Sequence, residues 1–171
     1  MNLAEAAARA QELADAGDER ELANLRREWE DEVEGAARDS DYRVRAVAYR
    51  ALGQFRYRQK LELLQRGLED ESPACRGSAL VSLELLSRDG PGIVNATRRK
   101  LHELASGDPN DAVRRLAIVC LKNGTPARET IVILRGLADT DEEDRQLRDT
   151  AGKIATFLQK KANVESSARR R

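Results

Sequence analysis

Apolar and polar positions alternate along this chain with the period of an α-helix. Leu22, Leu25, Trp29 and Val33 recur every three or four residues, which places them on one face of a helix. Three further stripes have the same spacing, namely Leu61/Leu64/Leu68, Val94/Leu101/Leu104 and Ile131/Leu134/Leu137. Turn-forming residues separate them, at Gly53, Asp89–Gly92 and Asn123–Pro126. The pattern therefore predicts a series of short amphipathic helices.

A second pattern recurs at a longer interval. Asp39 stands six residues before Arg45, an apolar residue directly precedes this arginine, and Ala48 follows three residues later. The arrangement returns around Arg76 and Arg114, and a looser copy, without the aspartate at that offset, surrounds Arg148. The intervals between the arginines are 31, 38 and 34 residues. Self-similarity at this period predicts an array of helical hairpins.

Each element of the repeated pattern has a physical reason. The aspartate is predicted to lie in the turn before a helix, where its carboxylate accepts free backbone N–H groups. The residues at offsets −1, +3 and +7 from the arginine share one helical face, so they are predicted to be core. An alanine at +3 in every copy indicates that neighbouring helices approach closely. The arginines recur at every step, which a structural ladder requires and a discrete site does not, so we expect a ladder rather than a set of anion ligands.

The turn aspartate, the apolar–Arg pair and the following alanine, as in Asp39, Val44, Arg45 and Ala48, resemble HEAT repeats of the short bacterial type. The resemblance implies an all-α fold, a right-handed α-α superhelix of about four hairpins. The intervals are uneven and shorter than the ~40 residues usual for HEAT repeats. We expect one domain over residues 1–162. It comprises a capping helix in 1–18, repeats in 19–56, 57–90, 91–124 and 125–162, and then a disordered basic tail in 163–171.

Composition narrows the candidate chemistry. Only 4% of residues are aromatic, while 35% are charged. His102 is the only histidine, so no metal site with two histidines can form, and we expect no metal, cofactor or enzymatic activity. Carboxylates are abundant, so a pair for acid–base chemistry stays open. Cys75 and Cys120 are predicted to be buried free thiols. With no long apolar run and no secretory signal, we expect a cytoplasmic location, and the arginine-rich composition suits a high-GC bacterium.

The second helix of each hairpin lines the concave face of such arrays, which makes it the candidate binding surface. The stripe opposite the predicted core lies at offsets +1, +4, +5 and +8. There, Leu80, Val81, Ile118 and Val119 form an apolar centre with a basic rim, which is typical of a protein-binding patch. In the alternative, the +4 residues pack inside and only +5 and +8 are exposed. The predicted partner-binding residues are Tyr49, Arg50, Val81, Glu84, Arg115, Val119, Lys122 and Lys153.

The sequence thus favours a non-catalytic adaptor, scaffold or regulator that binds an amphipathic, acidic segment of another protein. The alternative is a nucleic-acid-binding protein, which would use the basic middle, with 17 basic and 10 acidic residues in 42–138, and the tail Arg169–Arg171. Zero net charge and few aromatics for base stacking argue against it. Residues 1–41 hold 5 basic and 13 acidic side chains, and this acidic region can dock on the basic middle of a second copy. We therefore expect either a monomer or a weak head-to-tail self-association.

Overall fold

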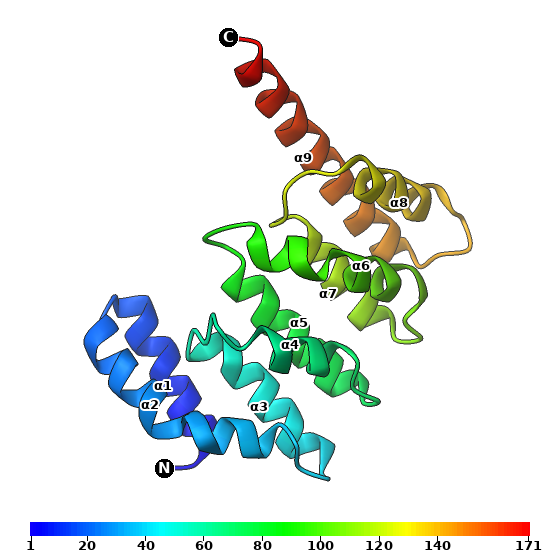
Figure 1. Ribbon diagram of the computed structural model, residues 1–171. Helices are drawn as coiled ribbons and strands as arrows, with labels where there is room; N and C mark the ends of the chain where they lie inside the picture. Colours follow the sequence, from blue (N-terminus) through cyan, green and yellow to red (C-terminus); the bar gives the residue numbers. More distant parts are fainter. The chain divides into compact units, whose positions relative to one another are not determined.

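The computed structural model describes residues 1–171 and contains nine α-helices and no strands (Figure 1). The all-α fold class predicted from the sequence is confirmed. The chain divides into two compact units, Met1–Leu86 and Ser87–Arg171, and each is described by itself. None of the helices has the length and apolar character needed to cross a membrane.

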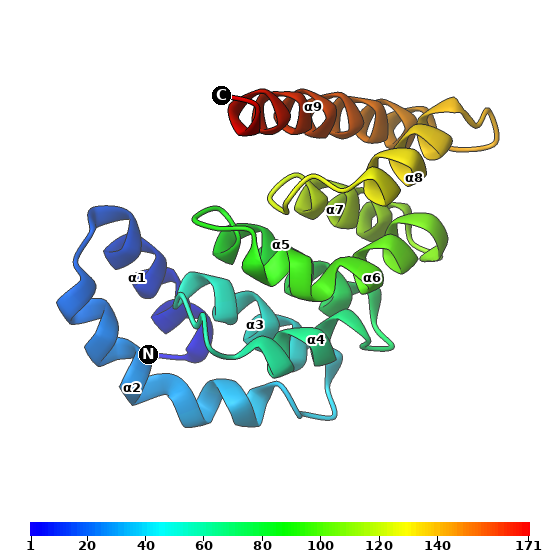
Figure 2. The same ribbon diagram turned by 45° about the horizontal axis from the view of Figure 1, so that its top comes forward.

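Unit 1 contains α1 (Leu3–Ala16), α2 (Glu19–Ala36), α3 (Tyr42–Gln54), α4 (Leu61–Leu68) and α5 (Pro73–Leu86). Helix α1 buries an alanine-rich face against α2 and α3. The most extensive packing in this unit joins α3 to α5, and Figures 1 and 2 show these two helices side by side. Helix α4 packs on α5, which completes the second hairpin.

Unit 2 contains α6 (Gly92–Gly107), α7 (Asp111–Leu121), α8 (Arg128–Asp139) and α9 (Arg145–Arg169). Helix α6 pairs with α7, α8 pairs with α9, and α7 also packs against α9. Helix α9 has 25 residues and α8 has 12, so α9 continues well past its partner (Figure 2). Residues 163–169, predicted as part of a disordered tail, are helical because no glycine or proline follows Gly152.

The repeated aspartates shape the turns, and their neighbours cap the helices. The Oδ1 atom of Asp39, Asp70 and Asp108 accepts the backbone N–H two residues further on, at 2.8, 2.9 and 2.9 Å. The side chains that cap α3 and α7 belong to Asp41 and Asn110. The predicted contact of the aspartate with backbone N–H groups is therefore present, but as a turn bond and not as the helix cap itself.

Small residues let the helices of unit 1 approach closely. The alanines at offset +3 have no exposed surface, namely Ala48, Ala79, Ala117 and Ala151. The backbone N–H of Gly53 donates to the Ser82 hydroxyl at 2.9 Å, and a Cβ atom at Gly53 would lie 2.8 Å from Ser82 Cα. A Cβ atom at Gly67 would lie 2.8 Å from the Ala79 Cβ. Because nothing larger fits, these positions set the distance between neighbouring helices.

One predicted core position is wrong. Val44, at offset −1 in the first repeat, is 37% exposed, whereas its counterparts Cys75, Val113 and Leu147 are buried. Cys75 is covered because its thiol donates to the Tyr42 carbonyl at the start of α3. The first turn of α3 has no equivalent cover on the side of Val44, so the same sequence offset has a different environment there.

The packing at Gly53 predicts that its replacement by alanine is costly. We expect Gly53→Ala to destabilise the chain by about 1–3 kcal/mol, because the added methyl overlaps the α5 backbone. The matched control is Gly35→Ala in α2, where nothing lies within 4 Å of the new Cβ atom and helix propensity should raise stability by up to about 1 kcal/mol. Urea unfolding measures both changes, and equal effects would contradict the proposed close approach.

Candidate functional site

The arginine of the first repeat bridges two successive hairpins. The Arg45 Nε and Nη2 atoms lie 2.8 and 3.0 Å from the two carboxylate oxygens of Asp70, which belongs to the next turn. Its Nη1 atom donates to the carbonyls of Asp39 and Ser40 in the turn before its own helix. Both charged side chains are nearly buried, at 12% and 8% exposure. The guanidinium is therefore fully used by structural contacts.

Unit 2 repeats this arrangement with a different acidic partner. Arg114 places Nη1 and Nη2 at 2.6 and 2.8 Å from the carboxylate of Glu143, in the turn before α9. Its Nε atom donates to the Ala105 carbonyl, in the hairpin to which Arg114 itself belongs. The degenerate fourth copy makes only a looser contact, from Arg148 to the exposed Asp141 at 3.4 Å. The contacts of Arg45 and Arg114 are those of a structural ladder, not of an anion site.

The ladder shifts the acidity of its carboxylates. Burial alone would raise the pKa of Asp70, but the hydrogen bonds from Arg45 and from the Ser72 backbone N–H outweigh it, so this pKa lies below its ordinary value. The hydrogen bond from Arg114 likewise lowers the pKa of Glu143. Both carboxylates therefore stay charged well into the acidic range, which suits a pairing role and not general acid catalysis.

The solvent-facing stripe of α3 differs from the predicted one. It follows offsets −2, +2, +5 and +9 from Arg45, with Arg43, Val47 and Arg50 exposed and Gln54 half-buried. Helix α5 follows the same register, with Ala74 exposed and with Ser78, Val81 and Leu85 half-buried. Only offset +5 is shared with the predicted stripe. The difference arises because α3 buries a broad arc, against α1, α2, α4 and α5.

Three predicted surface positions are inside the protein. Tyr49, Leu80 and Ile118, all at offset +4, have no exposed surface. The Tyr49 hydroxyl donates to the Ala37 carbonyl at 3.3 Å, and burial raises the pKa of this phenol. The predicted exposure of Tyr49 is therefore wrong, and this core side chain offers no surface to a partner. The alternative, in which the +4 residues pack internally, agrees with this burial.

The other predicted site residues reach the surface to different degrees. Arg50 and Lys153 are exposed, while the remaining five are half-buried, namely Val81, Glu84, Arg115, Val119 and Lys122. Four accessible apolar residues at offsets +2 and +9 were not predicted from the sequence. They are Val47, Leu85, Leu116 and the 50% exposed Phe157. A predicted stripe centred on offset +5 would include these four residues, because offsets +2 and +9 lie on the same face of the helix.

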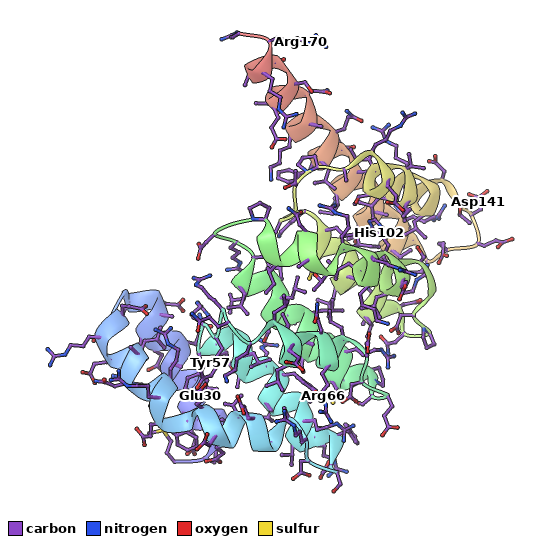
Figure 3. The ribbon with its side chains drawn as sticks, in the orientation of Figure 1. Glu30, Tyr57, Arg66, His102, Asp141 and Arg170 are labelled. Atoms are coloured by element: carbon purple, nitrogen blue, oxygen red, sulfur yellow. The ribbon has the colours of Figure 1, made fainter.

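A groove of about 530 Å³ lies between α2 and the α3–α4 loop in unit 1. Figure 3 shows Glu30 and Tyr57 together in this region. The Tyr57 hydroxyl donates to the Arg26 carbonyl at 2.5 Å, and burial together with the nearby Glu30 raises its pKa. The Lys60 ammonium lies 2.7 Å from Glu30 and 2.5 Å from Glu34. The charges of this groove thus largely pair with one another.

The single histidine lies in a buried polar contact of unit 2, on α6 (Figure 3). The Nε2 atom of His102 is 2.8 Å from the hydroxyl of Thr130, which also accepts a hydrogen bond from Arg98. The Thr130 hydroxyl can then donate its own hydrogen to the Nε2 atom of a neutral imidazole. Burial favours this neutral form, because it lowers the pKa of His102. No group of three or more His, Cys, Asp or Glu side chains in the chain could hold a metal ion.

Comparison with known families identifies HEAT repeats in this chain. The family model described as HEAT repeats matches residues 31–91, which include α3, α4 and α5. The match confirms the predicted resemblance to HEAT repeats. HEAT repeats are generally non-catalytic modules of protein interaction. No curated protein matches the chain with significant similarity.

The first prediction from this geometry concerns the ladder. We expect Asp70→Asn to destabilise the protein by about 2–4 kcal/mol at pH 7, because Arg45 is left nearly buried without its counter-charge. The charged Asp70 carboxylate stabilises the fold above the ordinary pKa near 4, and this contribution falls as the pH drops below it. The variant should therefore lose less stability than the wild type on acidification to about pH 2.

The matched control for Asp70→Asn is Asp141→Asn. The Asp141 side chain is 99% exposed, so the change should stay within about 0.5 kcal/mol of wild type. Chemical unfolding at a series of pH values measures both variants. Similar stabilities for the two variants would show that the ladder contributes nothing specific.

The second prediction concerns pH and the histidine. Because the folded pKa of His102 is lowered, its stabilising contribution is complete above pH 6.5 and falls as the pH drops below that value. We expect wild-type stability to decrease from pH 7.5 to about 5.5, and His102→Gln, whose amide can still bond Thr130, to be less sensitive. Unfolding of both proteins across this range measures the difference. Parallel pH profiles would contradict the assignment of a buried neutral imidazole.

Proposed function

We propose that this chain is a non-catalytic protein-binding module, an adaptor, scaffold or regulator, that holds a partner segment on the solvent-facing stripes of its second helices. The observation that carries the proposal is the set of residues at offset +5. Unit 1 presents Arg50 and Val81 from α3 and α5, and unit 2 presents Val119 and Lys153 from α7 and α9. Each unit thus offers one accessible valine and one cation, a pairing typical of protein-binding surfaces.

The neighbouring residues support the same chemistry. In unit 1, Val47 is 37% exposed between the cations Arg43 and Arg50. In unit 2, Leu116 and Phe157 add apolar surface on the helices that carry Val119 and Lys153. The fitting ligand is an amphipathic segment whose apolar residues are flanked by carboxylates.

The two cations at offset +5 are available to such a ligand. The side chains of Arg50 and Lys153 make no hydrogen bond or ion pair within the chain. The ladder arginines differ from them, because Arg45 and Arg114 already hold acidic partners. A partner carboxylate can therefore pair with Arg50 or Lys153 without breaking a contact of the fold.

The buried, reduced cysteines support a proposed location in a reducing compartment such as the cytoplasm. Cys75 and Cys120 are both buried, and neither forms a disulfide. Free buried thiols are ordinary in cytoplasmic proteins, whereas secreted domains of this size tend to oxidise their cysteines.

The proposed surface predicts which substitutions abolish partner binding. We expect the double variant Val81→Asp/Val119→Asp to reduce capture of the partner protein from a host lysate by at least about tenfold, because it places a charge in the apolar surface of each unit. The matched control is Val164→Asp, a substitution of a 70% exposed valine away from these residues. Nuclease-treated lysate, the tagged chain and quantitative mass spectrometry give the measurement.

Because Val81 and Val119 are half-buried, a second variant separates binding from folding. Arg50→Glu/Lys153→Glu changes only exposed, unpaired cations and should keep the wild-type melting temperature while weakening capture. If both double variants capture the same proteins as wild type, the proposed surface is not used. If capture depends entirely on nucleic acid, the protein-binding function is rejected in favour of nucleic-acid binding through Lys and Arg side chains.

A further inference from the structure

A second surface, on the first helix of the last hairpin, is separate from the residues described above. A groove of about 460 Å³ runs between α8 and α9 in unit 2. Its apolar wall comes from α8 and the segment before it, with Ala127, Ile131 and Val132, and Ala162 closes it from α9. Val132 is 60% exposed, so a large apolar side chain faces solvent in this groove. No carboxylate lines it.

Two unpaired arginines flank the apolar part of this groove. Arg128 and Arg135 line it from α8, both exposed and without a side-chain hydrogen bond or ion pair in the chain. Val132 lies between them, four residues after the first and three before the second. Seven residues of helix separate the two cations by about 10 Å along the axis. We call Arg128, Val132 and Arg135 the basic line of α8.

Helix α2 carries the same pattern with the opposite charge. Glu21, Leu25 and Glu28 have the identical spacing of four and then three residues. Both glutamates are exposed and their carboxylates make no hydrogen bond or ion pair in the chain, while Leu25 is half-buried beside them. Asp31 and Glu32 extend the negative charge by one more turn. We call Glu21, Leu25 and Glu28 the acidic line of α2.

The division of the chain into units separates these charges. Unit 1 holds 13 basic and 18 acidic side chains, a net charge of −5, and unit 2 holds 17 and 12, a net charge of +5. Two molecules with such units attract each other when unit 2 of one meets unit 1 of another. When the helices run parallel, matching spacings bring each glutamate opposite an arginine and Leu25 opposite Val132.

From these observations we infer that the α8–α9 groove of one molecule receives α2 of a second molecule of the same chain. The contact is heterologous, since two different surfaces meet, so a dimer keeps one free acidic line and one free basic line. Association of this kind proceeds head to tail and builds short chains or a ring. A groove-to-groove contact would instead bring Arg128 and Arg135 against the same cations of the other copy, which repel.

Sedimentation velocity of the full-length chain over a range of concentrations tests this inference. We expect wild type to form dimers and larger species in about 0.05 M salt and to return toward monomer in about 0.5 M salt, because screening weakens exposed charge pairs. The variant Arg128→Glu/Arg135→Glu and the variant Glu21→Arg/Glu28→Arg should each associate at least about tenfold more weakly, because like charges then face each other. Circular dichroism should show unchanged folds, since all four side chains are exposed and unpaired.

The decisive measurement mixes the two charge-reversed variants. In the mixture the acidic groove of one variant meets the basic α2 of the other, so association should recover to near the wild-type level and keep its salt dependence. A wild type that stays monomeric in low salt at every concentration overturns the inference. Variants that associate as wild type does, or a mixture that fails to recover, overturn it as well. The Val81→Asp/Val119→Asp variant should associate normally, which separates this contact from the proposed partner-binding surface.

Discussion

The close approach of neighbouring second helices is the constraint on which the rest of unit 1 depends. Helix α3 meets α5 where Gly53 leaves no room for a side chain above Ser82, and α4 meets α5 where Gly67 lies against Ala79. The Ser82 hydroxyl accepts a hydrogen bond from the Gly53 N–H and donates one to the Tyr49 carbonyl, so hydrogen bonds hold the two helices together at this close contact. With the backbones this near, the residue at offset +4 turns inward, and Tyr49 becomes core.

The close packing of the second helices also distinguishes two kinds of cation, those that pair within the fold and those that stay accessible to solvent. Arg45 and Arg114, at the recurring position, bind backbone carbonyls and an acidic residue of the next hairpin. Cations elsewhere on the second helices, such as Arg50 and Lys153, lie outside the packed arc and stay accessible. The accessible charge of these helices therefore comes from residues that the repeat pattern does not specify.

The surfaces proposed for partner binding and for self-association use different residues. The first uses the second helix of each hairpin, and the other uses α2 and the groove between α8 and α9. One molecule can therefore bind a partner while it contacts another copy. The net charges of the two units, −5 and +5, favour the contact between copies even though the whole chain is neutral.

The helical hairpins, the buried alanines at offset +3 and the arginine ladder could be predicted from the amino-acid pattern, because these features depend on spacing along one helix and recur from copy to copy. Which side of each second helix meets solvent could not be predicted in this way, because it depends on the packing of neighbouring helices. A helix in an array is covered by several neighbours, and the width of the covered arc depends on how closely they pack. Tyr49, Leu80 and Ile118 were therefore misplaced on the surface, and Val47, Leu85, Leu116 and Phe157 were missed. Val44 is exposed and Cys75 is buried for the same reason, because an identical offset from the arginine does not specify which neighbouring residues cover the side chain.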